Sequence, residues 1–306
     1  MIQQRPAALL ASLIVVIVMT GCRRNPDHES TGKPTVVVSI VPQAWLVDQV
    51  GGDHFDVSVL VRPGESPATY QPTDAQISHV MRAAVYFRIG VPFENGPWFD
   101  AIRASKRLKI VDIREGVPLR KMAWHAHGHR HDHDHHAGND PHIWLSPRLL
   151  KIQARTVTKT LQELAPAHGK DFAANLKRLE SRLDEVDNTI RSQLAPFGDK
   201  TFFVFHPAWG YFADDYGLRQ VAIEIEGKEP SDRELTRLQQ EARANGVRVL
   251  FVQPQISSRT AERVAAAIGG TVKKLDPLAA DVSAGLQRAA AALAQSYRHD
   301  NGRQHD

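Results

Sequence analysis

Histidines gather in one internal stretch of the chain. Residues 124–136 read W-H-A-H-G-H-R-H-D-H-D-H-H and hold seven of the fifteen histidines: His125, His127, His129, His131, His133, His135 and His136. Neutral imidazole is the commonest protein ligand for transition metals, so this stretch predicts an accessory metal-collecting surface. Its lack of apolar periodicity predicts a solvated loop over residues 124–137. The alternatives are a purification tag or a chance polar loop, but tags stand at chain ends as unbroken histidine runs.

Three other residues have the chemistry of a fixed metal site. His142 stands between Pro141 and the apolar residues 143–145, which predicts an ordered and partly buried position. His206 directly follows an apolar, strand-like run, and Asp276 directly follows the predicted strand at 271–275; ligands bind outside the carboxyl ends of parallel strands. Singly, each residue has a structural explanation, such as a helix cap or an Asp-Pro turn. Together, two imidazoles and a carboxylate match a Zn²⁺ ligand set.

Two series of alternating strands and helices must position these residues. The first has β-branched or apolar runs at 36–40, 57–61, 85–89 and 108–113, with helical stretches at 42–50, 73–84 and 96–105. The second has strands at 201–205, 221–225, 247–252 and 271–275, with helices at 231–244, 257–268 and 282–297. Strands that alternate with helices predict parallel α/β lobes.

Two consecutive helical segments separate the two series. One begins at Ser146-Pro147 and runs to about residue 164, and the next is amphipathic and uninterrupted from 169 to 194. At 1.5 Å per residue the second reaches roughly 35–40 Å, enough to run along two lobes. The alternative is an ordinary packing helix without a linking role.

The first residues predict export and anchoring. Arg5 precedes an apolar segment at 7–19 that is too short to span a bilayer, and Thr20-Gly21 leads into Cys22, the only cysteine. This pattern resembles a bacterial lipoprotein signal, with cleavage before Cys22 and lipid attached to it. The alternative is a secretion signal that leaves a free thiol. A lipidated Cys22 predicts an extracytoplasmic protein of the cell envelope that is held to the membrane by its lipid alone.

Composition and missing motifs exclude several functions. The net charge of +4 is spread along the chain without a basic stripe, which argues against nucleic-acid binding. No G-x-G-x-x-G follows the first strand, and no phosphate-binding G-x-x-x-x-G-K-[ST] occurs, so nucleotide binding has no support. Two histidines, a carboxylate and an open position could also form a catalytic zinc site. No H-E-x-x-H motif supplies the general base, and we expect no enzyme activity.

Short motifs then occur in a fixed order along the chain. They are V-L-V at 59–61 with P-G at 63–64, S-P-A-T-Y-Q-P at 66–72, D-P-H-I-W-L-S-P at 140–147, F-H-P-A at 205–208, G-Y-F at 210–212, Y-G-L at 216–218, E-P-S at 229–231 and L-D-P-L at 275–278. From about residue 36 to its last helix, the chain is similar to the metal-binding lipoproteins of ABC-type zinc and manganese importers.

The resemblance implies an architecture and a function. It implies two α/β lobes joined by a long rigid helix, with the metal in the cleft between them and His142, His206 and Asp276 as ligands. The implied limits are a signal peptide at 1–21, a tether at 22–34, lobes at 35–168 and 197–300, and a linking helix at 169–196. The resemblance also implies that the protein is a monomer and that its partners are a permease and the ATPase of that permease. The alternatives are a surface adhesin or a zinc chaperone, and less favourably a zinc hydrolase.

Two features of the sequence bear on the metal. The family's manganese members tend to have a carboxylate where this chain has His206, and imidazole suits Zn²⁺ better than Mn²⁺, so zinc is expected, with manganese, nickel and cobalt left open. The family's first ligand is a histidine at the position of Ala68, which cannot coordinate. Water, Glu65, Gln71 or a loop histidine must then complete the site. His54 and His168 are expected to be structural, and His79 to lie on a helix surface.

Overall fold

The computed structural model describes residues 32–122, 138–224 and 230–301. The expectations for the signal peptide, Cys22, most of the tether and the histidine loop fall outside these ranges. The compact unit Lys33–Asp306 is described below. Within the described ranges, no helix combines the length and the apolar character needed to cross a membrane.

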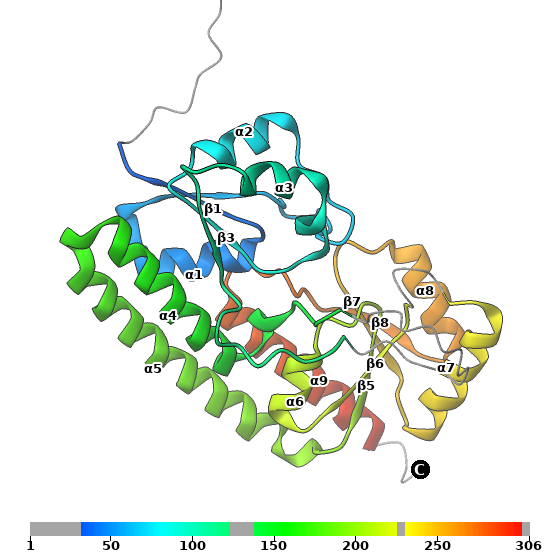
Figure 1. Ribbon diagram of the computed structural model, residues 1–306. Coiled ribbons are helices and arrows are strands. Elements are labelled where there is room, and N and C mark those ends of the chain that lie inside the picture. Colours follow the sequence, from blue (N-terminus) through cyan, green and yellow to red (C-terminus); the bar gives the residue numbers. More distant parts are fainter. Residues whose placement is uncertain (1–31, 123–137, 225–229, 302–306) are drawn as a thin grey trace, which may run out of the picture. The chain divides into compact units, whose positions relative to one another are not determined.

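A four-stranded parallel sheet forms the first lobe (Figure 1). Its strands lie in the order β2-β1-β3-β4, with bounds β1 (Thr35–Val38), β2 (Asp56–Val59), β3 (Val85–Arg88) and β4 (Lys109–Asp112). Helix α1 (Val41–Gly51) covers one face, and α2 (Asp74–Arg82) and α3 (Pro97–Arg103) cover the other. Right-handed crossovers require this, because the chain moves one way along the sheet through α1 and the other way through α2 and α3.

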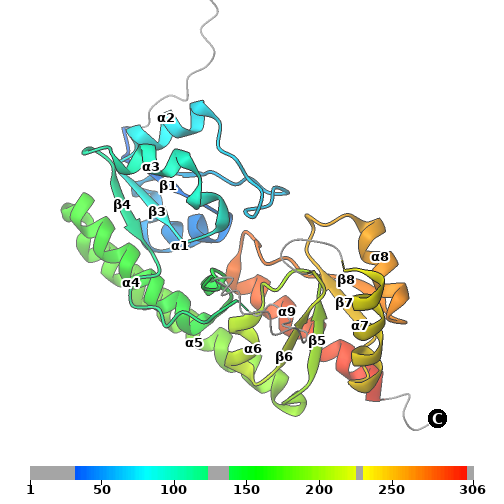
Figure 2. The same ribbon diagram turned by 45° about the vertical axis from the view of Figure 1, so that its right-hand side comes forward.

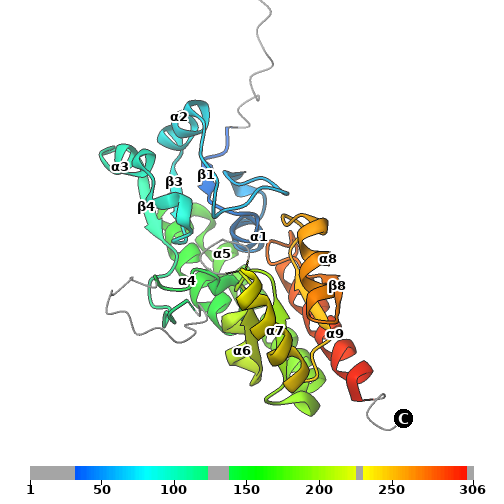
Figure 3. The same cartoon turned by 90° about the vertical axis from the view of Figure 1, so that its right-hand side faces the viewer.

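The second lobe repeats the plan with a sheet in the order β6-β5-β7-β8. The bounds are β5 (Thr201–Val204), α6 (Gly210–Tyr216), β6 (Arg219–Ala222), α7 (Asp232–Ala244), β7 (Val249–Val252), α8 (Ser258–Ala267), β8 (Thr271–Lys274) and α9 (Val282–Asn301). Helices α7 and α8 lie on one face of this sheet and α9 lies on the other (Figure 2). Figure 3 shows the molecule from the side of α7 and α8.

Strand β5 shows why the sheet is buried on both faces. Phe202 and Val204 belong to the large core shared with α9, whereas Phe203 and Phe205 belong to a separate core beneath α7 and α8. Successive side chains of a strand point to opposite faces, so an unbroken apolar run fills two cores.

A helical hairpin connects the lobes along the chain. Helix α4 (Pro147–Leu164) packs antiparallel against α5 (Gly169–Leu194), a helix of 26 residues. The side chain of Ser146 caps α4 by accepting a hydrogen bond from the backbone N–H of Leu149 at 3.2 Å. Helix α5 contacts α1 of the first lobe and α9 of the second. The predicted fold class, two parallel-sheet α/β lobes with one long helix, is confirmed, while the predicted residue limits of the domains stay predictions.

Most elements fall where the sequence places them, but α6 does not appear among the predicted helices. It has seven residues, and Gly217 ends it in the left-handed conformation (φ 65°).

Five short 3-10 turns complete the described structure: η1 (Gly52–His54), η2 (Pro92–Asn95), η3 (Ile143–Leu145), η4 (Pro166–His168) and η5 (Ala195–Phe197).

Candidate metal centre

Two imidazole rings from distant parts of the chain face each other. The Nε2 atoms of His142 and His206 lie 3.3 Å apart, with the ring planes at 70°. Two nitrogens bound to one tetrahedral Zn²⁺ at about 2.0–2.1 Å must stand about 3.3–3.4 Å apart. The two rings therefore already have the spacing of a shared zinc ion.

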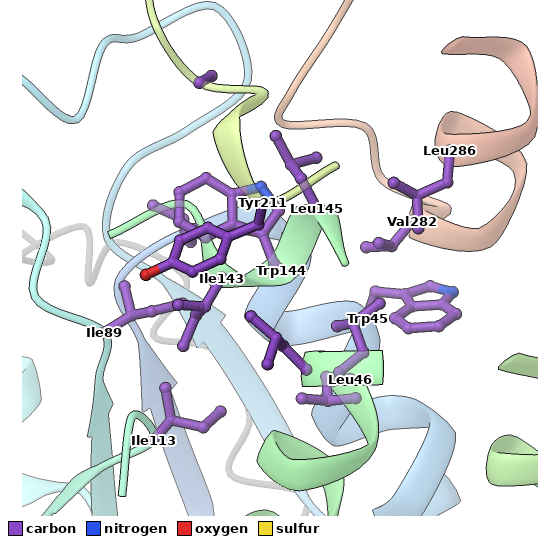
Figure 4. Close-up of a cluster of buried hydrophobic side chains, with 14 of the residues drawn as sticks. Trp45, Leu46, Ile89, Ile113, Ile143, Trp144, Leu145, Tyr211, Val282 and Leu286 are labelled. Carbon is purple, nitrogen blue, oxygen red and sulfur yellow. The ribbon is translucent and has the colours of Figure 1, made fainter. Parts of the chain in front are cut away.

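Packing on both sides fixes the segment that carries His142. Figure 4 shows Ile143, Trp144 and Leu145, the three residues of η3, inside a buried hydrophobic cluster with side chains from both lobes. The indole N–H of Trp144 donates to the backbone carbonyl of Pro277 at 2.6 Å. This bond joins the segment after His142 to the turn that contains Asp276.

Strand register places His206. In the parallel pair β5 and β6, Val204 lies opposite Ala222, so residues two positions further on, His206 and Glu224, come out side by side at the carboxyl end of the sheet. The backbone N–H of Glu224 donates to the carbonyl of Phe205 at 3.0 Å, which continues the pairing beyond the strands. The carboxylate of Glu224 then contacts Nδ1 of His206.

Each imidazole is held from behind by a carboxylate. Oδ1 of Asp140 lies 2.8 Å from Nδ1 of His142 and also accepts the backbone N–H of His142 at 3.0 Å. Glu224 does the same for the ring of His206, and both carboxylates are buried. A hydrogen bond from Nδ1 fixes the tautomer that leaves Nε2 free to bind metal, and it raises the basicity of the ligand. Sequence reasoning assigned no role to either carboxylate, although the strand register points to Glu224.

Arg120 and Gly210 support Asp140. Nη1 of Arg120 lies 3.6 Å from Oδ2 of Asp140, and its Nε pairs with Asp214 at 3.1 Å. The hydroxyl of Tyr211 accepts the backbone N–H of Arg120 and donates to the carbonyl of Asp140. The guanidinium fits only because Gly210 has no side chain, since a methyl group there would overlap Nη1 and come within 2.9 Å of Oδ2.

The third predicted ligand lies differently. Asp276 is exposed, and its Oδ1 accepts the backbone N–H of Leu278 at 2.9 Å, as in an Asp-Pro turn. Among the described residues, no oxygen of Asp276 comes within 4.8 Å of both Nε2 atoms. The structure thus brings His142 and His206 together but not Asp276, whose role as a ligand stays a prediction.

The loop that contains Ala68 places no His, Cys, Asp or Glu ligand atom beside both imidazoles in the described structure. Ala68 is exposed, and its backbone N–H donates to Oγ of Ser66 at 3.3 Å. The carboxylate of Glu65 accepts the backbone N–H of Arg62, and Gln71 is exposed. Within the described ranges, no other His, Cys, Asp or Glu brings a ligand atom within 4.8 Å of both Nε2 atoms.

Burial favours the neutral form of His142. Desolvation lowers the pKa of His142 below its ordinary value, and the neighbouring Asp140 opposes this shift. A neutral ring costs less to bury than a charged one, and only the neutral ring can bind metal. The position therefore favours the form of His142 that a metal needs.

The arrangement defines the class of two-lobed α/β binding proteins. The family model for the zinc-uptake complex component A, periplasmic (ZnuA), matches residues 36–296, and the chain belongs to this family. A crystal structure of ZnuA is 38% identical, with a TM-score of 0.78, and covers 86% of this chain and 99% of that one. A ZnuA deletion mutant with zinc bound is also 38% identical, with a TM-score of 0.77, over 86% of this chain and 98% of that one. The high-affinity zinc uptake system protein ZnuA of Bacillus subtilis is 27% identical over 278 residues, which are 88% of this chain and 86% of that protein. The resemblance inferred from the sequence motifs is confirmed.

The lowered pKa of His142 predicts a loss of stability in acid. Because the folded pKa lies below the unfolded one, the unfolded chain binds the proton first, so this contribution is complete above about pH 6.5 and declines as the pH falls toward the folded pKa. We expect the melting temperature of the metal-free protein to fall in this window, and less steeply for His142→Gln. Thermal unfolding monitored by circular dichroism from about pH 7.5 to 5 would measure it. Parallel curves for the two proteins would contradict the assignment.

The space at Gly210 yields a second prediction. Gly210→Ala must displace the Arg120 guanidinium, and Asp140 then loses its support behind His142. Since outer partners of metal ligands typically contribute 10–100-fold in affinity, we expect zinc binding to weaken by about that factor while the fold is kept. Gly198→Ala is the matched control, because nothing lies within 4 Å of the added methyl. Competition titration with a zinc chelator would compare them, and equal affinities would show that Arg120 does not position the site.

Proposed function

We propose that this protein is the extracytoplasmic solute-binding component of an ABC importer, which captures zinc and delivers it to a membrane permease. The observation that carries the proposal is the pair of Nε2 atoms 3.3 Å apart, each on a ring whose Nδ1 faces a buried carboxylate. Membership of the zinc-uptake family supports the same function. The metal is cargo, so the protein needs a site that binds and releases it, and no catalytic role is assigned.

The proposed ligands are His142, His206 and Asp276. The two imidazoles would hold zinc first, because their spacing already suits it. Asp276 would join by turning its free carboxylate oxygen toward the ion, since Oδ1 is engaged within its own turn. The fourth position falls to water, to Glu65 or Gln71, or to a histidine from the loop. Zinc is preferred to Mn²⁺ because borderline-soft imidazole is a better match for it, while Ni²⁺ and Co²⁺ remain compatible.

The remaining parts of the proposal concern delivery and attachment. The histidines of residues 124–136 would collect zinc at lower affinity and pass it to the fixed site. A lipid on Cys22 would keep the protein at the membrane surface, where a permease and its ATPase can receive the metal, and the protein would act as a monomer. These assignments rest on the sequence pattern and on the family.

The function predicts different effects of changing the fixed site and the loop. His206→Ala should abolish tight zinc binding, because one nitrogen of the pair is lost. Deletion of residues 124–136 should keep the tight site and remove the weaker binding of the loop. Isothermal titration calorimetry would measure both variants. In zinc-starved cells that depend on this protein, His206→Ala should fail to restore zinc accumulation. Full uptake by that variant would refute the transport role, and equal loss of tight binding in both variants would refute the division into loop and fixed site.

The alanine at position 68 predicts a gain of affinity. If water completes the site, Ala68→His should supply a further nitrogen and tighten zinc binding by at least tenfold, about 1.4 kcal/mol. If a loop histidine already fills the position, the gain should appear only after residues 124–136 are deleted. Thr69→His is the matched control, since Thr69 is the exposed neighbour of Ala68. Spectra of the cobalt-substituted proteins would report the change in ligands. An unchanged affinity and spectrum in both backgrounds would show that Ala68 does not face the metal.

A further inference from the structure

A second group of metal-binding side chains lies away from the histidine pair. His54, His168 and Asp171 each offer a ligand atom, and these atoms all lie within 4.8 Å of one another. His54 is the last residue of η1, which follows α1, and His168 is the last residue of η4, which connects α4 to α5. Asp171 is in the first turn of α5. Two segments that are far apart in the chain, the turn after α1 and the junction of α4 with α5, therefore bring two imidazoles and a carboxylate to one place.

This group is distinct from the His142–His206 pair. His142 lies five residues before Pro147, where α4 begins, and His168 lies just beyond Leu164, where α4 ends. An α-helix of 18 residues, the length of α4, is about 27 Å long at 1.5 Å per residue. The two places are therefore at opposite ends of α4 and cannot share one ion.

The packing around the group holds its elements together. The side-chain amide of Asn175 on α5 donates to the carbonyl of Val50 near the end of α1 at 2.8 Å. The ring of Phe172, which is fully buried, packs edge-on against His54 with ring centroids 5.5 Å apart, and against Phe55 at 5.7 Å. These contacts hold the turn after α1 against the start of α5. The fold itself therefore places the two histidines and Asp171 next to one another.

The side chains themselves have room to adjust. Nδ1 of His168 lies 3.9 Å from Oδ2 of Asp171, and the His54 and His168 rings stack with centroids 3.8 Å apart and planes at 28°. A metal binds an imidazole nitrogen in the plane of the ring, so one of two stacked rings must turn before both can bind one ion. Both histidines are only partly buried, and the side chain of Asp171 is 66% exposed, which leaves solvent access for that movement and for water ligands.

We propose that His54, His168 and Asp171 form a second binding site for a divalent transition metal, with zinc as the reference ion and Ni²⁺, Co²⁺ and Cu²⁺ as ions of the same ligand preference. Two imidazoles, one carboxylate and water are a ligand set that these ions accept. The site is weaker than the His142–His206 site, because its ligand atoms must still move together and compete with bulk water. A bound ion ties the turn after α1 to the turn between α4 and α5, and so stabilises the hairpin against the first lobe.

The first test locates the ion. Crystals of the full protein soaked in millimolar zinc should give an anomalous scattering peak among His54, His168 and Asp171, separate from any peak at His142 and His206. No peak there would overturn the proposal. A peak that appears only in the crystal, without the solution behaviour described next, would also overturn it, as binding at crystal concentration only.

The second test measures binding in solution. We use the protein with residues 124–136 deleted, so that loop histidines do not obscure the signal, and expect calorimetry to show one tight and one weaker zinc ion. Loss of an outer partner alone typically costs 10–100-fold, so Asp171→Asn should weaken the second ion by at least about tenfold. His168→Ala should remove it, and the tight ion should be unaffected in both.

The matched control is Glu185→Gln, which removes the same charge from an exposed position of α5, 14 residues and about 21 Å further along the helix. It should keep both ions. Because Asp171 is exposed, Asp171→Asn should fold normally, and circular dichroism would check this. Zinc should raise the melting temperature of the control more than that of Asp171→Asn. Equal stoichiometry and equal thermal shifts in the two variants would refute the site.

Discussion

Two imidazole nitrogens can lie 3.3 Å apart, away from most solvent, only because each ring is held from behind by a buried carboxylate. Asp140 and Glu224 orient the rings and accept the Nδ1 protons, and each carboxylate needs its own support. Asp140 receives it from Arg120, which in turn requires the bare backbone of Gly210. Glu224 receives it from the pairing of β5 with β6. Each ligand of the pair thus depends on its own series of supporting residues, and the two series lie in different parts of the fold.

The two ligands come from opposite sides of the α4–α5 hairpin along the chain. His142 precedes α4, and His206 follows β5 of the second lobe, so a metal between them links segments that only tertiary packing brings together. The buried Trp144, whose indole donates to the carbonyl of Pro277, anchors the His142 segment to the second lobe. Helix α5 contacts α1 and α9, which limits how far the lobes can separate. The relatives of known structure have the same two-lobed fold.

Much of this architecture could be predicted from the sequence, because its signals are local. The valine run of β1 and the uninterrupted period of α5 identify a buried parallel strand and a long amphipathic helix. Helix α6 was missed because seven residues are too few to show a period. The role of Glu224 behind His206 was missed because it depends on the register between two strands, which no local sequence pattern reveals. The stack of His54 on His168 joins turns over 100 residues apart in the chain, so single-residue reasoning left both histidines structural.

The base of the histidine loop lies beside the ligand support. The backbone N–H of Met122 donates to the carbonyl of Gly138, and that of Asp140 donates to the carbonyl of Arg120, so the residues that flank the histidine stretch pair with each other behind His142. His136 is six residues from His142, a chain length that spans at most about 22 Å. A zinc ion held by these histidines, as proposed above, would therefore be confined near the fixed site at an effective concentration of millimolar order. Transfer would then be an intramolecular step, and scarcity of zinc outside would limit only the first capture.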